Sequence, residues 1–224
     1  REIQAKRLDL PGHGSLARAR ALSGEAPIAA MVTFDELVVR YPDCYLVHLA
    51  RGHLNAEQDL LPQAENDLRR ALELAPESAD VLGALGMLLL NSGNAKEARP
   101  LLDKAAAARP EDIPLQVSAG MATLHVDGVA AGVKHLAATA EAHPYEVAPV
   151  MAMVTVLSQA GRPDAAYQVL DRAIAGNPHP TLLLAHAAAA KDVGDTKAAA
   201  RSLRELARIT GETRYARMAD ELGG

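Results

Sequence analysis

The residues most able to do chemistry in this sequence are its eight histidines and its single cysteine. Imidazole and thiolate groups bind metals and move protons, but a site needs several of them on one face or in one loop. His48 and His53 are five residues apart, so on a helix they point about 140° apart, which disfavours a shared metal. Cys44 has no second cysteine with which to form a disulfide or a thiolate cluster.

The carboxylates do not form a catalytic constellation either. They are interleaved with lysine and arginine, as on a solvated helix face; examples are Glu65, Glu97, Asp103, Asp164 and Asp171. The sequence has no His-Glu-x-x-His run, no glycine-rich phosphate loop and no Gly-x-Ser-x-Gly turn. We therefore expect no enzymatic activity, no metal and no cofactor.

Composition narrows the class of protein further. Hydrophobic residues make up 49% of the chain but aromatic residues only 3%, so burial depends on alanine and leucine, which favour helices. The formal charge of −5 comes without a basic stripe, which argues against nucleic-acid binding. No apolar run approaches the length of a membrane span, so we expect no direct membrane insertion and a cytoplasmic location.

The chain begins at Arg1 rather than at a methionine. This start favours a piece of a longer protein, from which an upstream signal or anchor could be missing. The alanine-rich composition, with arginine preferred to lysine, suggests a bacterial origin in a GC-rich genome.

The elements that carry these residues are set by a period of 34. Prolines recur at this interval, and so do glycines and large apolar residues in phase with them. The proline series is Pro42, Pro76, Pro110, Pro144 and Pro178, and the glycine series is Gly52, Gly86 and Gly120. A fixed period over most of a chain indicates helical pairs stacked as a solenoid.

Blocks of 34 residues give six repeats, each with two amphipathic segments around a short polar break. Their ranges are 11–44, 45–78, 79–112, 113–146, 147–180 and 181–214. Residues 1–10 are then an N-terminal extension or partial helix, and residues 215–224 a capping helix with an apolar stripe of Tyr215, Met218 and Leu222.

Four local details are predicted within these repeats. Residues 12–15 are expected to be a flexible entry that leaves the first helix of repeat 11–44 short. Asn94 and Glu97 have the spacing of a capping box. Pro100 falls about six residues into a helix and predicts a kink, unless that helix begins later. Gly86 and Ala98 are small where the two helices of their repeat cross closely.

The repeat 79–112 carries the clearest signature. Its residues at eight signature positions are Leu82, Leu85, Gly86, Leu89, Ala98, Leu102, Ala105 and Pro110. By unit length and by these residues, the chain resembles the tetratricopeptide repeat family. The resemblance implies an all-α, right-handed superhelical solenoid of about six repeats, whose first helices line a concave groove that binds partners.

Inward positions of the family pattern give the expected groove lining, which is small and apolar. It comprises Leu49, His53, Met87, Leu90, Asn91, Met121, Leu124, His125, Met151, Thr155, Gln159 and His186. Methionines in successive repeats adapt to varied apolar partners or fill gaps between helices. Only Asn91 is of the type with which family members clamp a peptide carboxylate, so a clamp of that kind is not expected.

These observations predict a non-catalytic interaction module, an adaptor or scaffold, that binds a protein or peptide segment in the groove. Two alternatives stay open at this point. The segment could be the targeting arm of a larger enzyme, such as a transferase. It could also be a self-assembling scaffold in which the end of one molecule docks into another.

Overall fold

The computed structural model describes residues 10–223, so most of the predicted N-terminal extension lies outside the described residues. Within them the chain forms thirteen helices and no strand, which confirms the all-α prediction. The helices are α2 (Leu10–Glu25), α3 (Pro27–Arg40), α4 (Tyr45–Glu57), α5 (Leu61–Leu74), α6 (Ala79–Asn91), α7 (Ala95–Ala108), α8 (Ile113–Asp127), α9 (Val129–Ala142), α10 (Val147–Gln159), α11 (Pro163–Gly176), α12 (Pro180–Asp192), α13 (Thr196–Thr210) and α14 (Thr213–Gly223).

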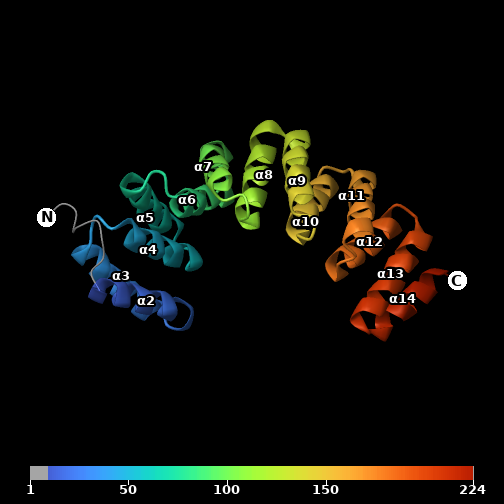
Figure 1. Cartoon of the computed structure of the whole chain (residues 1–224), viewed down its shortest axis with the longest axis horizontal. Coiled ribbons are helices and arrows are strands. Elements are labelled where there is room, and N and C mark those ends of the chain that lie inside the picture. Colours follow the sequence, from blue (N-terminus) through green and yellow to red (C-terminus); the bar gives the residue numbers. More distant parts are fainter. Residues whose placement is uncertain (1–9, 224) are drawn as a thin grey trace. The chain divides into compact units, whose positions relative to one another are not determined.

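The helices pack as consecutive pairs in two compact units, residues 1–110 and 111–224 (Figure 1). Unit 1 holds the pairs α2–α3, α4–α5 and α6–α7. Unit 2 holds α8–α9, α10–α11 and α12–α13, with α14 packed on α13. In unit 1 the first helix α4 also contacts α2 and α6, and in unit 2 α10 contacts α8 and α12. The first helices of each unit therefore lie next to one another.

Small residues set the close approach within each pair. A Cβ on Gly86 would lie 2.7 Å from Leu102 Cγ and 3.4 Å from the Ala98 carbonyl oxygen. Gly52 and Leu68 make the same contact one repeat earlier, at 2.9 Å. Because a neighbouring atom this close leaves no room for a methyl group, the glycine series marks the crossing points of first and second helices, as the sequence predicts for Gly86.

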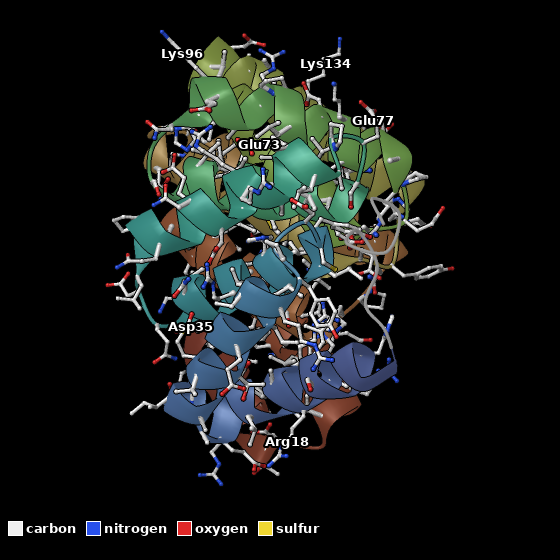
Figure 2. The ribbon with its side chains drawn as sticks, turned by 90° about the vertical axis from the view of Figure 1, so that its left-hand side faces the viewer. Arg18, Asp35, Glu73, Glu77, Lys96 and Lys134 are labelled. Carbon is white, nitrogen blue, oxygen red and sulfur yellow. The ribbon has the colours of Figure 1, made fainter. Side chains whose placement is uncertain are left out.

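Ion pairs join neighbouring second helices on the solvent side of unit 1. Arg69 of α5 binds Glu65 of its own helix at 2.7 Å and Glu97 of α7 at 2.8 Å. The charged residues Asp35, Glu73 and Lys96, labelled in Figure 2, lie one on each of the second helices α3, α5 and α7 and are exposed. The charged side chains of these second helices belong to a solvated face, in agreement with the sequence pattern.

Two local predictions need correction, one in the first helical pair and one in the third. The predicted flexible entry at residues 12–15 is part of α2, which is a full helix of 16 residues. Asn94 precedes α7, but its side chain accepts no capping hydrogen bond. Glu97 does not complete a capping box because its carboxylate binds Arg69 instead.

Pro100 lies inside helix α7. Helix α7 begins at Ala95 and continues through Pro100, so the alternative of a later start is wrong.

In α14 the apolar contacts come from Tyr215, Ala219 and Leu222, whereas Met218 is 43% exposed. The spacing of i, i+4 and i+7 therefore replaces the predicted stripe, because Ala219 rather than Met218 faces α13.

Candidate interaction surfaces and buried polar clusters

The predicted groove residues of unit 1 divide by exposure. His53 on α4 and Asn91 on α6 are exposed, and Met87 and Leu90 are half-buried. Leu49 is only 4% exposed, because α4 lies between α2 and α6 and the middle of its inward side is enclosed. Leu49 therefore supports the first-helix surface from below and does not line it.

Unit 2 presents an apolar strip on its first helices. Met121 and Leu124 of α8 and Met151 of α10 are half-buried, and both methionines pack against the core cluster that contains Met153 and Leu136. Three polar residues border the strip and are exposed: His125, Thr155 and Gln159. The hydroxyl of Thr155 donates to the carbonyl of Met151 at 2.9 Å, so it makes no demand on a partner.

This strip continues at α12 with a pocket of about 210 Å³ between α12, α13 and α14. Leu184, 45% exposed, and Met218 form part of an apolar lining, with Lys191 and Glu221 among the polar residues. Sequence reasoning missed this pocket because it assigned Met218 to the sealed side of α14. We call the strip and this pocket together the first-helix face of unit 2.

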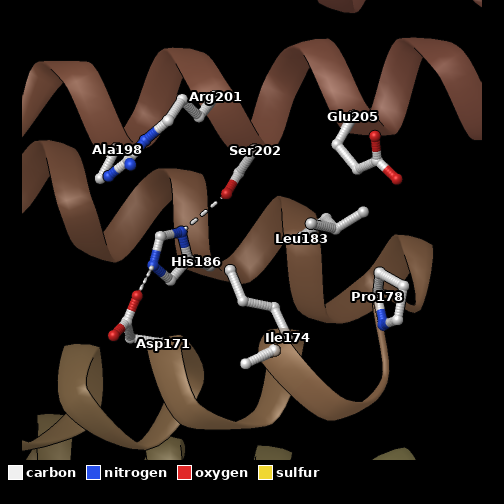
Figure 3. A pocket seen from close by; sticks show the side chains of 10 residues that line it. Asp171, Ile174, Pro178, Leu183, His186, Ala198, Arg201, Ser202 and Glu205 are labelled. Carbon is white, nitrogen blue, oxygen red and sulfur yellow. Dashed lines mark hydrogen bonds and ion pairs between the residues drawn. The ribbon is translucent and has the colours of Figure 1, made fainter.

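His186 is not on this face. It is 2% exposed and lies between the second helices α11 and α13, where its ring stacks against Tyr167 with centroids 5.1 Å apart. Its Nδ1 is 2.8 Å from Ser202 Oγ and its Nε2 is 3.5 Å from Asp171 Oδ1 (Figure 3). The equivalent position of the four preceding repeats holds Ala50, Ala84, Ser118 or Ala152, and the larger imidazole fills the space toward the second helices.

The order Asp171, His186 and Ser202 has the residue types of a catalytic triad. The arrangement lacks two further features of a catalytic triad, an accessible nucleophile and an oxyanion hole. Ser202 is 4% exposed, and it lies in the middle of α13, where the helix uses the neighbouring backbone N–H groups and leaves no oxyanion hole. Burial lowers the pKa of His186, so its neutral form is favoured.

A second buried polar cluster lies in unit 1. Asp67 of α5 is 5% exposed and accepts hydrogen bonds from Arg51 Nε and Nη2 at 2.9 and 2.7 Å and from Asn55 at 2.9 Å. Arg51 also donates to Asp35 at 2.8 Å, and His48 Nε2 is 2.8 Å from the Pro42 carbonyl. Burial alone would raise the pKa of the Asp67 carboxyl, but the attraction of His48 and Arg51 outweighs it and holds the pKa below its usual value.

This cluster was missed by sequence reasoning, although the repeat alignment contains a signal for it. Arg51 occupies a position that is Leu85 in the next repeat, and Asp67 one that is Leu101. Opposite charges at two positions that are both leucine in the next repeat indicate a buried ion pair. His48 is buried and His53 exposed, so the two histidines lie on different sides of α4, as their spacing predicts.

The described residues include no group of three or more histidine, cysteine, aspartate or glutamate side chains placed to hold a metal ion. None of the helices within residues 10–223 combines the length and the apolar character of a membrane span.

Comparison with known proteins agrees with this architecture. Residues 56–120 match the family model described as tetratricopeptide repeat. The bacteriophage adsorption protein A of Escherichia coli K12 is 35% identical over 65 residues, which are 29% of this chain and 7% of that protein. The chain thus aligns with only a small part of this relative's length.

Two solved structures extend the similarity over most of the chain. PilW, a widely conserved type IV pilus biogenesis factor, superposes with a TM-score of 0.70 at 17% identity, covering 94% of this chain and 99% of its own. YrrB, a tetratricopeptide repeat protein with an unusual peptide-binding site, gives a TM-score of 0.53 at 16% identity over 84% of this chain and 97% of its own. Identities this low establish the fold alone. Residues 56–120 therefore carry tetratricopeptide repeats, and the chain as a whole has the fold of tetratricopeptide repeat proteins.

Proposed function

We propose that the chain is a non-catalytic interaction module that binds an apolar segment of a protein partner along the first-helix face of unit 2. The observation that carries the proposal is the continuity of half-buried and exposed apolar side chains over three first helices in contact with one another. They are Met121 on α8, Met151 on α10 and Leu184 on α12.

Physical chemistry supports a peptide as the occupant. Burying the exposed part of these side chains releases water, and the flexible, polarizable methionines can adapt to different aliphatic residues. The pocket at α14 accepts one larger side chain. Polar groups at the border, such as Gln159 and His125, are available to bond to a peptide backbone. In unit 1, Met87, Leu90 and Asn91 supply a smaller surface of the same kind.

Site-specific photo-crosslinking tests the proposal directly. A photoreactive phenylalanine analogue replaces Thr155, which is exposed beside Met151, and in a matched variant replaces Gln168, which is exposed on the second helix α11. After irradiation in cells that express the chain, we expect a crosslinked protein from position 155 only. Adding Met121→Glu and Met151→Glu to the first variant should abolish it.

Other outcomes separate the alternatives. Equal crosslinking from both positions would contradict a specific first-helix face. A crosslink between two copies of the chain at position 155 would instead identify a self-assembling scaffold. Circular dichroism of the double glutamate variant controls for loss of fold.

A further inference from the structure

A pocket of about 400 Å³ lies between α11, α12 and α13 on the second-helix side of unit 2 (Figure 3). Asp171 of α11 and Glu205 of α13 both line it and are 34 residues apart, so they occupy equivalent positions on neighbouring second helices. His186 of α12 lies between these two helices. The pocket is distinct from the first-helix face, and its argument does not rest on that proposal.

The polar groups of the pocket include both acceptors and donors: the carboxylates of Asp171 and Glu205, the hydroxyl of Ser202, the imidazole of His186 and the guanidinium of Arg201. Because Nε2 of His186 faces a carboxylate, we assign the proton of the neutral ring to Nε2, and Nδ1 then accepts from the hydroxyl of Ser202. The Ser202 oxygen keeps its lone pairs. His186 Nε2 is buried and has no hydrogen bond of normal length, since Asp171 is 3.5 Å away. The incompletely satisfied group is thus an N–H donor that faces the Asp171 carboxylate.

The partner that faces Asp171 is the imidazole of His186, 3.5 Å away. The side chain of Asp171 is 63% exposed, and within residues 10–223 no lysine or arginine lies within ion-pair distance of it. Glu205 is bound by Arg208 at 2.6 Å, but the arginine is 70% exposed, and pairs of this kind contribute little and exchange easily. Arg201 also lines the pocket, and its side chain extends toward Ala198 and away from Glu205 (Figure 3).

The remaining lining is apolar. Ile174, Pro178 and Leu183 lie below Glu205 and Ser202 in Figure 3. A straight hydrocarbon stem can pack on these residues while its charged end reaches the acceptors. Lysine has this shape, and its ammonium can pair with the exposed Asp171 carboxylate at the mouth of the pocket.

We propose that the pocket between α11, α12 and α13 binds a lysine side chain of a protein partner, with Asp171 as its principal counter-charge. The chain would then hold a partner through a charged contact on its second-helix side, independently of an apolar segment on the first-helix face.

The proposal can be tested by NMR titration of the full chain with Nα-acetyl-lysine methylamide at pH 7. A ligand of this size should bind with a dissociation constant on the order of 1 mM. We expect saturable shifts of the His186 imidazole nitrogens and of the Ser202 amide. The matched probe Nα-acetyl-norleucine methylamide has a similar stem without the charge and should bind about tenfold more weakly or not at all.

Variants complete the design. Asp171→Asn should weaken lysine binding about tenfold, a loss of about 1.4 kcal/mol, whereas Asp164→Asn, an exposed carboxylate in the first turn of α11, should not change it. Equal binding of norleucine, no saturation up to about 50 mM, or tighter binding of the corresponding arginine compound would each overturn the proposal of a lysine site. So would full binding by the Asp171→Asn variant.

Discussion

Single residues decide how closely the helices of each pair approach. Gly86 illustrates this, because Leu102 fills the space that a side chain would need and is itself fully buried. Arg51 and Asp67 show the opposite case, in which two charged residues replace apolar ones and remain stable only as a hydrogen-bonded pair.

Gly86→Ala should destabilise the protein by about 1–2 kcal/mol. The added methyl overpacks against Leu102 at a cost of about 1–3 kcal/mol, which exceeds the gain of up to about 1 kcal/mol from the helix propensity of alanine. The control is Gly14→Ala in α2, where nothing lies within 4 Å and only the propensity gain applies. Urea unfolding followed by circular dichroism should show midpoint shifts of opposite sign; equal shifts would contradict the steric account.

Asp67→Asn should cost about 1–3 kcal/mol at neutral pH, because it removes the buried counter-charge of Arg51 and leaves the guanidinium with the exposed Asp35 alone. The pKa of Asp67 is depressed in the folded protein, so its contribution is present above the usual value near 4 and is lost as pH falls through the folded pKa. The difference in unfolding free energy between the two proteins should therefore be smaller at about pH 3 than at pH 7. A constant difference would assign the effect to packing alone.

At the level of helices, much of the architecture could be predicted. The period, the paired helices and the crossing at Gly86 follow from sequence because each depends on neighbours at fixed spacing. Side-chain placement within a helix was less predictable. His186 and Met218 each lie on a different side of their helix from the predicted one, because one residue along a helix turns a side chain by about 100°.

The polar clusters could not be predicted from local pattern. Arg51 meets Asp67, and His186 meets Ser202, across 16 residues in each case, so both pairs depend on how two helices cross. The groove lining remains a prediction for its exposed members.

Helices α11, α12 and α13 should lose stability as the solution becomes acidic. Burial lowers the pKa of His186, so the unfolded chain binds a proton more readily than the folded one below the ordinary value near 6.5. The contribution of the neutral imidazole is full above that value and declines as pH falls. Amide exchange of α12 should accelerate between about pH 7 and pH 5 relative to a His186→Gln variant after correction for intrinsic rates; parallel profiles would exclude His186 as the cause.

The last helix provides a test of adjacent residues. Ala219→Asp places a charge where the side chain is 0% exposed and should cost about 3 kcal/mol. Met218→Asp, at a side chain that is 43% exposed, should cost less than about 1 kcal/mol. Limited proteolysis should cleave α14 readily in the first variant only. Equal cleavage of both would restore Met218 to the apolar stripe.

For the whole molecule, the repeats predict that damage stays local. Each helical pair contacts mainly its neighbours, so stability is close to a sum of nearest-neighbour terms. In hydrogen exchange, Ala219→Asp should deprotect α12, α13 and α14 and leave α4, α5 and α6 of unit 1 as in the parent chain. Uniform loss of protection across both units would indicate a single cooperative fold.

The joint between α8 and α9 has a practical consequence for protein engineering. Gly128 alone separates these helices, with φ of +92° and ψ of 175°, a conformation that only glycine adopts readily. A tag or domain inserted there would have no loop residues to connect it to the two helices. The exposed three-residue turns around Gly93 and Gly161 are better insertion points, because a reporter placed there would leave the helices in register.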